Sequence, residues 1–170
     1  GEFDRIMVRP RNEIFQVLTS NVDFTRIGRL MQAVLMLIYA VPVSGIIWSP
    51  DKVITIVVMI IGGIVMFSAL FVLYAGISFF TIEGLEFMNI FTDGGREFGK
   101  YPFSIYGEGV LKFFTYIIPL ALFQYYPFLY LTGKSGNIGL IFLPLMGFVF
   151  MIPCYSIFKY GIKRYKSTGS

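Results

Sequence analysis

The stretch VITIVVMIIGGIVMFSALFVLYAGISFF, residues 53–80, contains no charged side chain. As a straight helix it would measure roughly 42 Å, which exceeds the roughly 30 Å hydrocarbon core of a bilayer. The pattern therefore predicts a membrane-spanning helix that tilts, bends or protrudes. Gly62, Gly63 and Gly76 lie within it. Such small residues permit close contact with a neighbouring helix, although simple tolerance of glycine in membrane helices explains them equally well.

Three more apolar runs accompany this one, over residues 30–48, 110–131 and 138–158. Each is long enough to cross a bilayer as a helix. The sequence thus predicts an all-α, polytopic membrane protein with about four transmembrane helices, in a transmembrane domain over residues 30–158. Prolines interrupt the last two runs, which should kink or break where a backbone hydrogen bond is lost, and either run could be partly re-entrant. The prolines are Pro119, Pro127, Pro144 and Pro153.

The composition excludes several classes of protein. With 56% hydrophobic and 14% charged residues, the chain has more apolar surface than a soluble domain of this length could bury, so lipid must be its main solvent. The net charge of +4 does not indicate nucleic-acid binding, because the basic residues sit at the ends of apolar runs. The single cysteine, Cys154, excludes a disulfide or a cysteine-based metal site within one chain and is expected to be buried. The absence of histidine removes the usual general base and the commonest metal ligand.

The distribution of Lys and Arg predicts the orientation in the membrane. Segment 1–29 holds five of them, the middle loop 81–109 with the start of the next run holds three, and the tail 159–170 holds four. Only Lys52 and Lys134 fall in the two remaining loops. By the positive-inside rule, this alternation places both termini and the middle loop in the cytoplasm.

No motif for bond chemistry stands out. The string GKS at 133–135 is like the end of a phosphate-binding loop, but that motif requires glycine at the position where Phe128 stands. Any ATP chemistry is therefore expected in another chain. Glu83 and Glu86 could share a helix face, yet a solvated loop explains them better than a pair of catalytic carboxylates. Coupled ion transport usually needs ionisable groups within the membrane, and only Lys112, near a span end, is a candidate.

The N-terminal segment 1–29 carries two helical patterns. Asn12 is a fair helix cap before the short, largely apolar stretch 13–18. A second start at Asn21 leads with helical spacing into the first span. This segment is either an interfacial helix lying on the membrane or a docking helix for a cytoplasmic partner.

Three strings carry a resemblance to a known family: FDRIMVRPRNEIFQVL near the start, GREFGKYPFSIYGEGVLKFFTYIIPLALFQYYPFLYL in the middle and YGIKRYKSTGS at the end. In this order and spacing they resemble the permease subunits of type-2 ATP-binding-cassette exporters, in the branch of small bacterial six-helix permeases. The resemblance runs from about Phe3 to Ser170. Its features are Asp4 with Arg9-Pro10, Tyr101-Pro102 with Tyr106, Ile118-Pro119 followed by Tyr126-Pro127, and Tyr165 with Ser167-Thr168-Gly169.

The resemblance implies six helices per permease and a cytoplasmic coupling segment, between the second and third helices, that contacts the ATPase. Because the chain starts at Gly1 without a methionine, we expect a fragment that begins inside the coupling segment, 1–29, and holds the last four helices. The implied partners are an ABC-type ATP-binding subunit, a second permease in a homo- or heterodimer, and the lipid of a bacterial cytoplasmic membrane. The residues implied to lie at or near the coupling region are Asp4, Arg9, Pro10, Phe15 and Gln16.

The favoured function is ATP-driven export of an unidentified substrate, with no cofactor, metal or enzymatic activity in this chain. A substrate path between two permeases would be lined by polar groups within the second and third runs. The candidates are Tyr74, Ser78, Tyr116 and Gln124. The lack of histidine and of acids in the spans disfavours a membrane-embedded enzyme, whereas a non-catalytic scaffold or assembly protein stays open. Lipids, peptides, drugs and polysaccharides all fit a largely apolar path.

Overall fold

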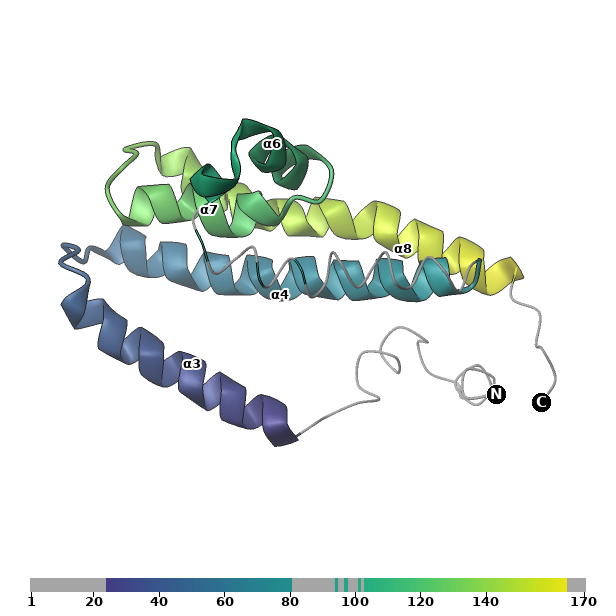
Figure 1. Cartoon of the computed structure of the whole chain (residues 1–170), viewed down its shortest axis with the longest axis horizontal. Coiled ribbons are helices and arrows are strands. Elements are labelled where there is room, and N and C mark those ends of the chain that lie inside the picture. The colour runs from purple at the N-terminus through teal and green to yellow at the C-terminus, as the bar shows by residue number, and fades with distance from the viewer. Residues whose placement is uncertain (1–23, 81–93, 95–96, 98–100, 102, 165–170) are drawn as a thin grey trace. The chain divides into compact units, whose positions relative to one another are not determined.

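The computed structural model describes residues 24–80, 94, 97, 101 and 103–164, and the described residues form helices and short connections (Figure 1). This confirms the predicted all-α membrane protein. The elements are α3 (Phe24–Val43), α4 (Pro50–Ser78), the 3₁₀ helix η1 (Phe103–Tyr106), α6 (Glu108–Tyr116), α7 (Leu120–Leu131), the 3₁₀ helix η2 (Ile138–Leu145) and α8 (Met146–Arg164).

The chain divides into two compact units, one with residues 1–47 and 166–170 and one with residues 48–165. In the first unit, α3 begins before the span predicted at 30–48 and ends before Trp48. Pro42 lies in its last turn, and Gly45 follows with a φ of +66°, a left-handed conformation that suits glycine. The chain therefore leaves the helix within a few residues of Pro42.

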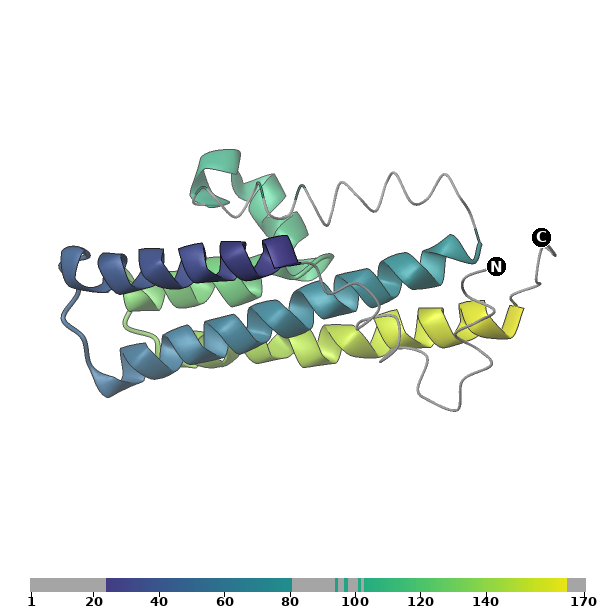
Figure 2. The same ribbon diagram turned by 90° about the horizontal axis from the view of Figure 1, so that it is seen from below.

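The second unit is organised around α4 and α8, which lie side by side in both Figure 1 and Figure 2. The two helices run parallel, since Gly62 of α4 faces Pro144 at the end of η2, whereas Gly76 near the end of α4 faces Phe158. Parallel packing is what the second and fourth of four alternating spans require. Gly62 and Gly76 are therefore contact glycines, not merely tolerated ones.

Two elements are long and apolar enough to cross a membrane: α4, with 29 residues, and the continuous element Ile138–Lys163, with 26. The pair α6 and α7 meets the same criterion only when taken together, across a bend of 113°. The apolar part of α3, Ile27–Val43, is shorter. The described residues thus hold two candidate spans, or three with the bent pair, and a fourth span at α3 stays a prediction.

Candidate functional site

The third apolar run, predicted at 110–131, breaks between α6 and α7. The N–H groups of Ile117 and Ile118 both donate to the carbonyl oxygen of Phe113, at 3.0 and 3.3 Å, so the helical pattern ends there. Pro119 follows with φ −72° and ψ 46° as the residue before α7. Because proline has no N–H and its ring crowds the preceding turn, the helix can change direction at low cost at this point. The result is the 113° bend.

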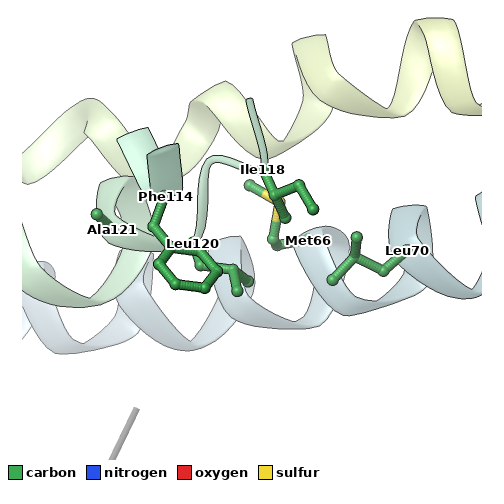
Figure 3. Close-up of a cluster of buried hydrophobic side chains, with 6 residues drawn as sticks. All are labelled: Met66, Leu70, Phe114, Ile118, Leu120 and Ala121. Carbon is green, nitrogen blue, oxygen red and sulfur yellow. The ribbon is translucent and has the colours of Figure 1, made fainter. Parts of the chain in front are cut away.

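The bend rests on a small apolar core against the middle of α4 (Figure 3). Six side chains meet there, and each is at most 7% exposed. They come from all three helices and from the break itself, so the core fixes the bend to α4. They are Met66 and Leu70 of α4, Phe114 of α6, Ile118 of the break, and Leu120 and Ala121 of α7.

Aromatic and small residues position α7 on α4. Phe123 of α7 packs edge-on against Phe67, with ring centroids 6.0 Å apart. Its ring edge also lies where Gly63 leaves room, because a Cβ at position 63 would stand 3.2 Å from it. α7 runs antiparallel to α4, since Tyr130 at its other end reaches Asp51 in the first turn of α4.

Two tyrosine hydroxyls, one turn apart on α7, hold the helix to its neighbours. Tyr130 donates to a carboxylate oxygen of Asp51 over 2.6 Å. The hydroxyl of Tyr126 lies 3.2 Å from that of Thr115 in α6, across the bend. Thr115 has one hydroxyl hydrogen and donates it to the carbonyl of Leu111 at 2.6 Å, so Tyr126 donates to Thr115. We call these two bonds the tyrosine tethers of α7.

The comparison with known families supplies the identity. The family model described as ABC-2 family transporter protein matches residues 1–169. The chain belongs to this ABC-2 family. No curated protein and no solved structure gives a significant match.

The predicted resemblance is therefore confirmed, and the protein is a multi-pass membrane permease component of an ABC transporter. Membership of the ABC-2 family implies association with an ABC ATP-binding subunit and with the membrane. Within the described residues of this permease, no group of three or more His, Cys, Asp or Glu side chains could hold a metal ion.

The four predicted path residues of the ABC-2 permease lie on three different helices. Tyr74 is half-buried on α4, and Ser78, in its last turn, donates its hydroxyl to the carbonyl of Ala75 at 2.8 Å. Tyr116 ends α6 with 82% of its surface exposed, and Gln124 is half-buried on α7. The path they would line stays a prediction.

The five predicted coupling residues, Asp4, Arg9, Pro10, Phe15 and Gln16, lie outside the described residues. The tyrosine tethers, in contrast, were not anticipated. Tyr126 and Tyr130 of α7 make the two tethers, with Thr115 and Asp51 as their partners. Their spacing of four residues on one helix face was the available signal, but nothing in the sequence identifies their partners.

Proposed function

We propose that this ABC-2 permease exports a substrate across the bacterial cytoplasmic membrane, driven by ATP hydrolysis in a separate subunit. The observation that carries the proposal is the match of the family over residues 1–169. A helix pair bent at Pro119 packs beside the long parallel pair of α4 and α8. This arrangement supports a role in conformational change rather than in bond chemistry. The second permease of the complex is either a copy of this chain or a related one.

The geometry suggests which parts move. α4 and α8 are packed through backbone-to-glycine contacts, so they should move as one rigid body. α6 and α7 join this body through the core at the bend and the tyrosine tethers. Rotation of the α6–α7 pair at Pro119 would alter the surroundings of Tyr116 and Gln124 relative to Tyr74 and Ser78. We propose that this rearrangement opens the substrate path.

Energy would reach this unit through segment 1–29, with Arg9 and Phe15 at the contact with the ATPase. The test is co-purification of the full-length permease with its candidate ATP-binding subunit in nanodiscs, followed by ATP hydrolysis assays. Arg9→Glu and Phe15→Ala should each weaken the complex or remove the effect of the permease on ATP hydrolysis. Lys134→Glu, with the same change of charge in a loop predicted to lie outside, is the matched control and should leave both unchanged.

The outcomes separate the alternatives. An intact complex with unaltered hydrolysis in Arg9→Glu and Phe15→Ala would reject these residues as coupling residues. A wild-type permease that never associates with the ATP-binding subunit would favour the non-catalytic scaffold. A gene for an ATP-binding subunit directly beside that of the permease would favour the exporter.

The proposed orientation has its own test. Single cysteines at position 134 and at position 163, in a variant with Cys154→Ala, would be treated with a membrane-impermeant maleimide on intact cells. Position 134 should react and position 163 should not, because the positive-inside rule places the C-terminal end of α8 in the cytoplasm. Labelling of position 163 alone would show that the orientation in the membrane is the reverse of the proposed one.

A further inference from the structure

The helix α6 carries a charged face that points away from the helices it packs against. Glu108 and Lys112 form an ion pair at 3.3 Å, and their side chains are 89% and 70% exposed. Gly109 and Tyr116 share this face and are exposed as well. Phe114, on the opposite side, is buried in the core at the bend. α6 is therefore amphipathic, and the described helices leave its polar side uncovered.

α6 lies across the long helices instead of along them. α7 runs antiparallel to α4, and the chain turns by 113° between α6 and α7. This bend places the axis of α6 close to a right angle with α7, as the two views of the ribbon also show (Figure 1, Figure 2). α6 therefore runs nearly parallel to the membrane surface when α4 and α7 stand across the bilayer.

The depth of α6 in the membrane follows from its place along α4. The bond between Asp51 and Tyr130 marks one end of the helices, and the core that holds α6 lies at Met66 and Leu70 of α4. At 1.5 Å per residue, Leu70 stands roughly 28 Å from Asp51 along the helix. A bilayer has a hydrocarbon core of roughly 30 Å. When Asp51 lies at one headgroup layer, α6 therefore lies close to the other.

We propose that α6 binds the headgroup layer of the leaflet in which α4 and α8 end, as a helix lying in the plane of the membrane. Glu108 and Lys112 contact lipid headgroups and water there, as the polar face of an interfacial helix does. Residues 72–78, the last two turns of α4, then extend past the hydrocarbon core. Tyr116, a candidate path residue, lies where the path would meet this surface. The inference rests on the membrane location of the protein and holds whatever the substrate or the direction of transport.

A strongly tilted α4 is the alternative. With 29 residues, α4 measures roughly 44 Å, and a strong tilt would fit nearly its whole length into the hydrocarbon core. The same tilt would draw α6 below the headgroups, because α6 is joined to the middle of α4. Glu108 and Lys112 would then stand in hydrocarbon, where charged side chains are costly. The charged face of α6 therefore favours an α4 that protrudes.

The test measures the depth of spin labels on single cysteines in the full-length permease, reconstituted in nanodiscs with Cys154→Ala as the background. Collisions with oxygen, which concentrates in the bilayer, and with a water-soluble nickel chelate report the depth of each label. Positions 109 and 116 lie on the charged face of α6 and leave its ion pair intact. Positions 64, 71 and 78 form a matched ladder on α4, because they are seven residues apart, exposed and on one helix face.

The ladder on α4 should pass from lipid into water. Seven residues correspond to roughly 10 Å along a helix, so position 64 should report hydrocarbon, position 71 its boundary and position 78 water. Positions 109 and 116 are equally far apart on α6. Both should nevertheless match the depth of position 71 to within half a step of the ladder.

Three results would overturn the proposal. Depths at positions 109 and 116 that differ by a full step of the ladder would show that α6 crosses the membrane. A label at position 78 in hydrocarbon would show that α4 tilts and takes α6 with it. Labels on α6 that are shielded from both reagents would show that another protein surface, and not the headgroup layer, covers the charged face.

Discussion

The α4–α8 contact and the attachment of α7 hold the same unit together by different means. Along α4 and α8, glycines let backbones touch: a Cβ on Gly62 would meet the Pro144 carbonyl oxygen at 2.7 Å, and one on Gly76 would meet the Phe158 backbone at 3.0 Å. α7 is only 12 residues long, and it is attached through one apolar core, the ring pair of Phe67 and Phe123, and two tyrosine hydroxyls.

The difference bears on the proposed rearrangement, in which the attachment of α7 opens and the α4–α8 contact stays closed. Close backbone packing has no alternative arrangement of similar energy, because any sliding of the helices creates overlap or voids. A hydroxyl bond can be exchanged for another partner at little net cost, since its net contribution to stability is small. A transporter that needs one fixed and one movable part could use these two contacts in those roles. Four tests, each with its own substitutions, probe them.

The largest effect is expected from Gly62→Ala. The added methyl group would collide with backbone and ring atoms of Pro144 that cannot rotate away, so α4 and η2 must separate. We expect the unfolding free energy in detergent to fall by about 1–3 kcal/mol. Thermal denaturation of the purified protein measures it. A variant as stable as the wild type would contradict the close contact at this position.

A smaller effect is expected at the bend. Thr115→Val and Tyr126→Phe each remove the hydroxyl pair across it and should each cost about 1 kcal/mol. Thr115→Val also removes the bond from Thr115 to the Leu111 carbonyl. The double variant should therefore be little worse than Thr115→Val alone, because Tyr126→Phe removes a bond that Thr115→Val has already removed. Spin labels at positions 108 and 134 should show a broader distance distribution if the bond restrains the bend.

Tyr116→Phe is the control for this pair. Tyr116 is 82% exposed, and it lies next to Thr115 at the end of α6, directly before the bend. It should change neither the stability nor the distances. Fully additive effects of Thr115→Val and Tyr126→Phe would show that the two hydroxyls act separately, against the assigned bond.

Removal of the other tether should matter less. Tyr130→Phe deletes the bond to Asp51, but this pair lies at the N-terminal end of α4, where water can take the place of the hydroxyl. We expect a small decrease in the midpoint of thermal unfolding, below that of Gly62→Ala. Asp51→Asn keeps an acceptor oxygen and should change the midpoint less than Tyr130→Phe. A Tyr130→Phe variant as unstable as Gly62→Ala would mean that α7 is fixed rather than tethered.

The smallest effect is expected from Gly109→Ala. Gly109 is a helical glycine in α6 with open space where its Cβ would be. Gly109→Ala therefore makes the same chemical change as Gly62→Ala, at a position where the added methyl group meets no neighbour. Alanine is the better helix former, so stability should stay equal or rise by about 0.5 kcal/mol. A loss comparable to that of Gly62→Ala would show that helix context, not the contact with Pro144 of η2, explains the glycine effect.

Sequence reasoning reached the class of the protein and its family, but not the way in which the runs pack. Runs without charge can only be helices in lipid, because every backbone group must be bonded internally. The prolines were less informative. The third run breaks at Pro119, whereas α7 continues through Pro127 and α8 through Pro153. Each proline removes the same hydrogen bond, so only the surrounding helices decide whether the chain bends there.

The sequence by itself determined that this protein lies in a membrane, that it is helical and that it belongs to a family of transporter permeases, because hydrophobicity and motif order are properties of the chain alone. Only the tertiary structure decided that Gly62 and Gly76 are contact positions, that the third run turns by 113° at Pro119, and that Tyr126 and Tyr130 bind Thr115 and Asp51. These features depend on which surfaces meet in space, and residues 79 positions apart along the chain carry no local signal of their contact.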